Sequence, residues 1–398
     1  MKLLLISRDF PNMFGGVSDY TYHLSRALAE KGEDVYVLTS KDERVIVDMG
    51  NNVKVLPEVE RWGFRGLPKI IKEIRKVNPD WVLLQYVPYM YSHYGVPLWI
   101  ILLVIFLKIN KFKLLTTFHE VAIRFDFKKT KYWGIAVMQR LIAYVIGLVS
   151  FKIIVSINHY KNMLKIFSEK ISVIPVGSSI LPINLSEKEK FKLRNKIAPN
   201  GEFIITTFAT GVPKGSSNIY TKRHLDIVIR GVKEYCKQTS EKANLIVLGK
   251  MQNELRKALE ELIVHLHMGG NVIITGFLKN EDLFRLLSIS DVLVLIEGRE
   301  MNNYSGISTK SSIVAAAYAA GLPIIGNNGE LTDNFFRDGE NVILIGEKGL
   351  TPQAIAQKIQ MVLNDKSLLS KLRKGSKKTY EEYLSWDAVA NRYIEILK

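Results

Sequence analysis

Cysteine is almost absent from this sequence, and its absence excludes two classes of structure. A single cysteine, Cys236, stands among 398 residues. One thiol cannot build a disulfide framework or a zinc site with cysteine ligands. His265 and His267 are two positions apart, so on a helix their rings point to different sides. We therefore expect no bound metal.

Long apolar runs and several common catalytic motifs are missing as well. The most apolar stretch, residues 96–107, has 12 residues, whereas a membrane-spanning helix needs about 20. Only four apolar side chains, from Leu3 to Ile6, precede Arg8 and Asp9, and a secretory signal needs roughly 7–15. No P-loop, serine-nucleophile elbow or dinucleotide-binding glycine motif occurs. These absences predict an intracellular protein.

Acidic residues are too few to balance the basic ones. Lysine and arginine number 55 against 39 aspartates and glutamates, which leaves a net charge of +16. Residues 108–165 hold eleven basic and two acidic side chains, more than half of the excess. Such a concentration favours an anionic partner: nucleic acid, an acidic membrane surface or a phosphorylated substrate. A solvated face that keeps the protein soluble explains the pattern equally well.

Short runs of Val, Ile and Leu alternate with segments of helical period along the whole chain. Strands are expected at residues 2–7, 34–39, 53–56, 80–86, 113–118, 152–157, 172–175, 203–208, 244–248, 272–275, 292–296, 323–325 and 342–345. Helices are expected at residues 17–31, 224–237, 254–265, 280–287, 310–320 and 352–363. This alternation is typical of parallel sheets covered by helices.

The pattern occurs twice, on either side of a segment with two prolines and several serines at residues 176–189, which we interpret as a linker. We predict an α/β protein of two doubly wound Rossmann-like domains, residues 1–178 and 179–383, that face each other across a cleft. A terminal segment, residues 384–398, is expected to form a helix that packs back on the first domain. Because such sheets bind ligands beyond the carboxyl ends of their strands, we expect the site in the cleft.

The apolar stretches 96–107 and 133–149 allow two interpretations. They fit buried crossover helices of the first sheet, which is the more common situation. Together with the basic residues around them, they also fit a membrane-surface face.

Two candidate sites follow strands of the first domain. Gly15 and Gly16 lie in the loop after the first strand, just before a helix. Glycine there allows close approach of a ligand, and a helix N-terminus attracts phosphate or sugar oxygens, although any tight turn uses glycine. His119 follows residues 113–118 and could donate to a substrate oxygen; a structural histidine is the competing interpretation.

Two further candidates lie in the second domain. Lys222 and Arg223 stand at the start of a helix, where adjacent cations are unfavourable unless an anion is bound, so they suggest a diphosphate. Lys214, in the preceding loop rich in glycine and serine, is an alternative phosphate contact. The segment 302–310 is the other candidate, because its residues 305–309 place hydroxyls and a glycine at another helix N-terminus. The alanines that follow are explained by close packing on the sheet.

The order and spacing of these motifs are similar to those of the family 4 glycosyltransferases, retaining enzymes of the GT-B fold that use nucleotide-sugar donors. The likeness extends over nearly the whole chain. The segments that carry it are 14–17, 23–32, 117–120, 173–177, 222–224, 272–278 and 315–323, with Glu330, Asp338-Gly339 and Ser385-Trp386.

The resemblance implies a role for each matching residue. His119 would face the transferred sugar, and Lys222 would neutralise the departing nucleoside diphosphate. The backbone of residues 276–278 would hold the base. The donor-binding positions that it implies are Gly15, Gly16, Arg223, Gly276, Phe277, Leu278, Gly306, Ser308, Thr309, Lys310 and Glu330.

The sequence departs from the family pattern at its paired glutamates, because those positions hold Ser308 and Ala316. A subgroup carries the pattern G-x-S-x-[RK] instead, which residues 306–310 match, so Lys310 would contact phosphate. Glu297 and Glu300 are candidates for the missing carboxylate. The arginine expected after the first strand of the second domain is also absent, and Arg223 could replace it.

We therefore expect a retaining, hexosyltransferase-type enzyme that needs neither metal nor cofactor and moves sugar from a nucleotide diphosphate to a glycan or a lipid-linked acceptor. We expect it in the cytoplasm, at the inner membrane face, in contact with anionic lipid and not with nucleic acid. A sugar-nucleotide epimerase and a nucleotide-sugar-binding protein without catalysis are the alternatives.

Overall fold

The computed structural model describes residues 1–11, 13, 15–50, 53–125, 130–209, 223–298, 305–346 and 349–398. The chain divides into two compact units. Residues Met1–Ser179 and Tyr383–Lys398 form the first unit, and Ile180–Glu382 form the second.

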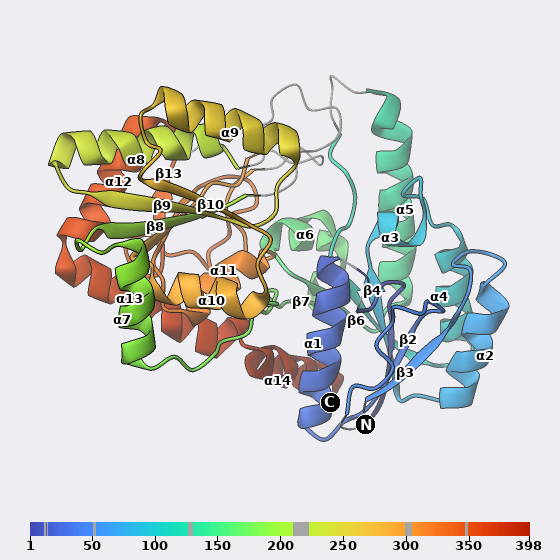
Figure 1. The fold of residues 1–398 in the computed structure, drawn as a ribbon. Helices are drawn as coiled ribbons and strands as arrows, with labels where there is room; N and C mark the ends of the chain where they lie inside the picture. Colours follow the sequence, from blue (N-terminus) through green and yellow to red (C-terminus); the bar gives the residue numbers. More distant parts are fainter. Residues whose placement is uncertain are drawn as a thin grey trace. The chain divides into compact units, whose positions relative to one another are not determined.

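A parallel sheet forms the core of the first unit (Figure 1). Its strands are β1 (Lys2–Ile6), β2 (Asp34–Ser40), β3 (Val53–Val59), β4 (Trp81–Tyr86), β5 (Lys113–Phe118), β6 (Lys152–Val155) and β7 (Ile171–Val173). They lie in the order β3-β2-β1-β4-β5-β6-β7. The direction of the order therefore reverses between β1 and β4, which is where such sheets bind ligands.

Helices cover this sheet, and one of them comes from the end of the chain. They are α1 (Gly16–Glu30), α2 (Leu67–Val77), α3 (Pro88–Tyr91), α4 (Trp99–Ile109), α5 (Trp133–Val149), α6 (Asn158–Met163) and α14 (Trp386–Leu397). The terminal helix α14 packs along α1 (Figure 1). Val389, Ala390 and Tyr393 of α14 are fully buried, so the core of the first unit includes residues from both ends of the sequence.

The second unit contains another parallel sheet. Its strands are β8 (Phe203–Phe208), β9 (Ala243–Leu248), β10 (Val272–Gly276), β11 (Val292–Leu295), β12 (Ile324–Asn327) and β13 (Ile343–Ile345). Their order is β10-β9-β8-β11-β12-β13, which reverses between β8 and β11. The helices are α7 (Glu187–Ile197), α8 (Leu225–Thr239), α9 (Asn253–His265), α10 (Asn280–Ile289), α11 (Ser312–Ala319), α12 (Pro352–Asn364) and α13 (Lys366–Thr379).

The predicted fold class, with two doubly wound Rossmann-like domains, is confirmed by these two sheets. The expected linker at 176–189 needs correction, because α7 begins inside it at Glu187. Ser186 and Glu189 form a reciprocal capping box there. The sequence contains this motif as Ser-x-x-Glu. It starts a helix in a segment whose prolines and serines had predicted a loop.

The two apolar stretches form α4 and α5, and each helix buries only one side. The other side of each helix is apolar and solvent-exposed, at Leu102, Ile105 and Ile109 of α4 and at Val137, Leu141, Tyr144 and Leu148 of α5. Among the described residues, no helix is long and apolar enough to cross a membrane. The interpretation as crossover helices on the sheet therefore accounts for one face of each helix and leaves the other face unexplained.

Candidate functional site

His119 lies directly after β5 and beside Gln85 of β4. Its backbone N–H donates to the carbonyl oxygen of Tyr86 at 3.0 Å, and its Nε2 lies 2.9 Å from Oε1 of Gln85. Because an amide oxygen only accepts, Nε2 carries the proton and Nδ1 remains an acceptor. Burial lowers the pKa of His119 to about 4. The ring is therefore neutral near pH 7 and can accept a hydrogen bond from a hydroxyl.

Aromatic side chains from α1 and α14 support the His119 ring. The ring of Tyr20 stands edge-on to it, with 4.7 Å between centroids. The hydroxyl of Tyr20 lies 2.9 Å from that of Tyr393, which is 2.8 Å from Oγ1 of Thr117. Tyr20 also meets Trp386 edge-on at 5.2 Å. The terminal helix thus limits where the imidazole can move.

Two polar residues in the otherwise apolar α5 hold the loop that follows His119. Oε1 of the buried Gln139 accepts from the N–H of Ile123 at 2.8 Å, and its Nε2 donates to the carbonyl of Gly95 at 3.1 Å. Arg140 donates to the carbonyl of Ile123 at 2.9 Å. These contacts explain why the apolar pattern of the helix is interrupted at these two positions.

Gly15 and Gly16 stand at the start of α1, where Gly15 is the N-cap and its carbonyl accepts from Asp19 at 3.1 Å. A Cβ at either glycine would meet no heavy atom of the described residues within 4 Å. Neither packing nor backbone strain requires glycine here, since the φ of Gly15 is extended. The positions remain open to a ligand on the side of the missing side chain.

The second unit brings Arg223 and Glu297 together beyond the carboxyl ends of its central strands. Nη1 of Arg223 forms an ion pair with Oε1 of Glu297, and the arginine is 7% exposed. Asn327 fixes the backbone of Glu297 by accepting from its N–H at 2.8 Å and donating to its carbonyl at 3.0 Å. The candidate carboxylate Glu297 therefore lies beside Arg223, a residue predicted to bind phosphate.

The loop at residues 305–310 closes against the turn after β12. Gly306 has a φ of 101°, and a Cβ there would lie 2.6 Å from the backbone nitrogen of Gly329. The N–H and Oγ of Ser305 both donate to Oε2 of Glu330, at 3.1 and 3.3 Å. The predicted residues Gly306 and Glu330 thus belong to one cluster with Arg223 and Glu297, because the N–H of Gly306 also donates to the carbonyl of Glu297 at 3.1 Å.

The hydroxyls of this loop are less accessible than the sequence suggested. Ser308 and Thr309 are buried, and Oγ1 of Thr309 donates to Asp333 at 3.3 Å. Lys310, next to them, is half-buried. Lys310 is therefore the most accessible polar side chain among these three candidates.

Gly276 ends β10, at the edge of the second sheet. Its φ is 72°, and no heavy atom of the described residues lies within 4 Å of the position of a Cβ. The ring of the next residue, Phe277, is 72% exposed, while Leu278 is half-buried. An exposed aromatic ring beyond a strand end offers a flat surface on which a base can stack.

Lys222 and Glu300 lie outside the described residues, as does the alternative phosphate contact Lys214, so their roles remain predictions. Within the described residues no group of three or more His, Cys, Asp or Glu side chains could hold a metal ion.

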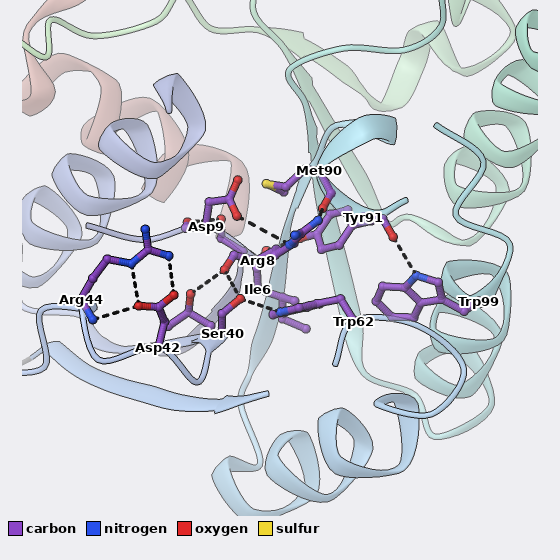
Figure 2. Close-up of polar contacts among 12 residues, drawn as sticks. Ile6, Arg8, Asp9, Ser40, Asp42, Arg44, Trp62, Met90, Tyr91 and Trp99 are labelled. Carbon is purple, nitrogen blue, oxygen red and sulfur yellow. Dashed lines mark hydrogen bonds and ion pairs between the residues drawn. The ribbon is translucent and has the colours of Figure 1, made fainter. Parts of the chain in front are cut away.

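Sequence reasoning missed a polar cluster at the carboxyl ends of β1 and β2, drawn in Figure 2. Arg8 donates through Nη1 to the carbonyl of Met90 at 2.6 Å, and its own carbonyl accepts from Oγ of Ser40 at 2.7 Å. The indole N–H of Trp62 donates to the same Ser40 oxygen at 2.8 Å. Charged residues placed directly after a buried strand, as Arg8 and Asp9 are, were the available signal.

Comparisons with known proteins identify related families for both halves of the chain. The model described as Glycosyltransferase Family 4 matches residues 14–178, and the model described as Glycosyl transferases group 1 matches residues 216–379. A lipopolysaccharide core biosynthesis glycosyltransferase, LpsE of Rhizobium meliloti (strain 1021), is 25% identical over 146 residues, which are 36% of this chain and 39% of that protein. The match thus spans about two fifths of the relative.

Solved structures share the fold along nearly the whole length. A glycosyltransferase from Rickettsia africae ESF-5 is 19% identical with a TM-score of 0.71, and the comparison covers 100% of this chain and 97% of that one. Anabaena HepE in complex with UDP is 14% identical with a TM-score of 0.70, covering 100% and 99%.

Proposed function

We propose that this chain, which belongs to the family 4 glycosyltransferases, transfers a hexose from a nucleotide diphosphate sugar to a glycan or a lipid-linked acceptor at the inner membrane face, with retention of the anomeric configuration. The described residues of the second unit would hold the donor. Those around His119 would contact the transferred sugar.

The main support for this proposal is that Arg223 is buried and only partly hydrogen-bonded. Its guanidinium is buried, and its Nε has no hydrogen-bond partner among the described residues. A buried, incompletely satisfied cation is unfavourable. It stands just before α8, whose free N–H groups attract negative charge. A diphosphate would satisfy both features, and Glu297 would hold the guanidinium in place until the donor binds.

We expect the reaction to depend on stabilisation of the negative charge that develops on the leaving diphosphate. Cleavage of the bond between sugar and phosphate leaves negative charge on the diphosphate, which Lys222, Arg223, Lys310 and the N-termini of α8 and α11 would stabilise. We propose that these groups suffice without a metal ion. The departing phosphate would take the proton of the acceptor hydroxyl on the same face, which retains the configuration.

Membrane association is supported by the exposed apolar faces of α4 and α5. Lys108 lies in the last turn of α4, and Lys111 and Lys113 follow that helix. Arg140 belongs to α5, and Lys152 follows it. Apolar side chains flanked by basic ones bind the surface of anionic bilayers. This arrangement favours a lipid-linked acceptor over a soluble one.

The proposal is tested by incubating the purified protein with a panel of UDP-, GDP-, ADP- and dTDP-sugars and extracted lipid-linked glycans, with and without EDTA. We expect acceptor-dependent release of one nucleoside diphosphate and an α-linked product from an α-linked donor, unaffected by EDTA. An inverted product would overturn retention, and loss of activity with EDTA would overturn metal independence.

A variant test addresses the phosphate contacts. Lys222→Ala is expected to lower turnover by roughly 10²–10³-fold, the usual effect of losing a group that stabilises developing charge. Lys257→Ala on the exposed side of α9 is the control. Full activity of the Lys222 variant would remove that residue from the mechanism.

The same assays separate the two alternatives. Conversion of the donor sugar to its epimer without any acceptor would favour an epimerase. Calorimetric binding of nucleotide without turnover on any acceptor would favour a binding protein.

A further inference from the structure

A cavity of the second unit lies at the end of the sheet away from the donor-site candidates. It has a volume of about 740 Å³ and is lined by α7, by α13 and by the residues just before β11 and β12. Asp291 and Leu322, which line it, precede these strands, whereas Glu297 and Asn327 lie at or beyond their other ends. Since the four residues of β11 extend about 13 Å, the two sites are separate.

A buried carboxylate paired with arginine forms the floor of this cavity. The buried Asp291 accepts from the backbone N–H of Ile204 and from Nη2 of Arg194, at 2.8 and 2.7 Å. Arg194 also donates to the carbonyl of Ile289 at 2.7 Å, and Arg373 approaches Asp291 at 3.7 Å. The one deep carboxylate is therefore already engaged by two arginines.

The walls carry positive charge that the described residues do not neutralise. Lys190 pairs with Glu187 at 2.7 Å, which leaves Lys366, Lys374 and Lys377 on the side of α13. Within the described part of the chain, the side chains of Lys366 and Lys374 form no hydrogen bond or ion pair, and the Lys377 ammonium has only a longer-range attraction to Glu187. Six basic side chains line the cavity against two carboxylates.

The composition of α13 strengthens this observation. The helix contains no acidic residue and six basic ones, and several lie three or four positions apart, where like charges repel. The alkyl chain of Lys377 also crosses Gly321, where a Cβ would lie 2.8 Å from Cε. The lysine stem is thus held at the cavity, and an anion between α7 and α13 would relieve the repulsion.

We propose that this cavity binds a phosphate-bearing anion, separately from the donor. Lysine ammonium groups act as compact, adjustable donors to the oxygens of a phosphate. The exposed ring of Phe191 and the side chain of Leu369 form an apolar part of the wall, which suits an organic group attached to the phosphate. The ligand is a free phosphate ester or diphosphate, or the headgroup of an anionic phospholipid.

Lysine acetylation of the intact wild-type protein, read by mass spectrometry, tests this site. The probes are inorganic pyrophosphate and vesicles of phosphatidylcholine with phosphatidic acid. Lys371 and Lys378 are matched internal controls, because they lie on the same helix but do not line the cavity. At ten times its dissociation constant the ligand occupies about nine tenths of the sites, so acetylation of Lys366 and Lys374 should slow roughly tenfold.

Selective protection by pyrophosphate identifies a free phosphate as ligand, and selective protection by vesicles alone identifies a headgroup. Equal protection of Lys371 and Lys378, or no protection by either probe, would overturn the proposal. Because pyrophosphate can also bind at the donor site, the double variant K366Q/K374Q should lose only the part of the pyrophosphate-dependent thermal stabilisation that comes from this cavity. Its stabilisation should therefore be smaller than that of K371Q/K378Q, which keeps the wild-type shift. Both variants change exposed side chains, and glycosyl transfer, which depends on the other end of the sheet, should be unaffected in each.

Discussion

Gln85 is a polar residue inside an apolar strand, and its contact with His119 explains why a polar side chain stands there. It is fully buried between Leu84 and Tyr86. Its amide oxygen determines which nitrogen of His119 holds the proton. A glutamine in a run that is buried on both faces is a signal that the sequence contains, but its partner cannot be known before β4 and β5 are paired.

We predict that Gln85→Leu lowers the transfer rate about tenfold, the equivalent of one hydrogen bond of about 1.4 kcal/mol. The imidazole would lose its fixed tautomer while keeping its packing. Steady-state kinetics should show the effect in kcat more than in the KM for the donor. Gln238→Leu, on the exposed side of α8, serves as control. An unchanged kcat would show that Gln85 has only a structural role.

The two histidines of this region predict how stability depends on pH. Burial lowers the pKa of both His119 and His23 to about 4, below the value of about 6.5 in an unfolded chain. The unfolded state therefore takes up protons first. Stability is complete above about pH 6.5 and falls as the pH decreases toward 4, by up to about 3 kcal/mol for each histidine.

Urea unfolding at pH 7.5, 6 and 4.5 measures this loss. In His23→Gln the decline between pH 7.5 and 4.5 should be shallower than in the wild type. An identical slope in both proteins would contradict the assignment to His23, whose ring stacks on Trp386 at 5.3 Å between centroids.

At the scale of elements, the buried hydroxyl of Tyr393 helps to hold α14 on the first unit. Tyr393 connects Tyr20 of α1 with Thr117 of β5, so Tyr393→Phe leaves two buried hydroxyls with one partner fewer. We expect a loss of about 1–3 kcal/mol in unfolding free energy, measured by chemical denaturation. Tyr383→Phe is the control. A loss below 0.5 kcal/mol, the usual range of surface changes, would mean that the hydroxyl chain contributes little.

The loop at Gly306 predicts a larger effect in the second unit. Gly306→Ala combines a left-handed φ with a Cβ 2.6 Å from a backbone nitrogen, which the surrounding backbone cannot easily avoid. We expect a loss of roughly 1–3 kcal/mol and weaker binding of nucleotide, measured by calorimetry. Gly269→Ala has open space and no positive φ, so it should be neutral.

Several elements were predicted correctly from the period of their apolar residues, although α2, which has a helical period too, was not predicted. Residues 113–118 and 203–208 form β5 and β8 as expected, and the terminal helix spans the expected residues. Helix α7 was missed because it is rich in lysine and has no buried side chain. Helix α13 was missed although Leu372, Ser376 and Thr379 lie buried along one of its sides. Their sides pack on α10 and α11, a tertiary contact that propensity cannot reveal.

At the scale of the whole molecule, the sequence shows where the excess of basic residues lies. It does not show that the neighbouring helices α4 and α5 expose an apolar side to solvent. Helices that are apolar all round are usually buried, and α4 and α5 depart from that rule on one side. Whether such a side meets protein or solvent depends on which helices cover the sheet, and that arrangement is not local. The contact between Arg223 and Glu297 could not be predicted from the sequence for the same reason. The two residues are 74 positions apart and meet only because β8 and β11 are neighbours in the sheet.

We predict that Ile105→Ser with Leu141→Ser weakens binding to vesicles containing anionic phospholipid by about tenfold or more, because two exposed apolar side chains no longer enter the bilayer surface. Vesicle sedimentation measures the partition coefficient. Val264→Ser, at an even more exposed apolar position in the second unit, should bind like the wild type. Equal binding of all three proteins would exclude the α4 and α5 faces as the membrane contact.

The membership of α14 in the first unit has a consequence for biosynthesis. The chain leaves that unit after Ser179 and returns to it only at Tyr383. On the ribosome, the apolar side of α1 that α14 covers therefore stays uncovered while about two hundred further residues are translated. At roughly 5–20 residues per second that interval lasts about ten seconds or more, long enough for chaperones to engage the unfinished unit.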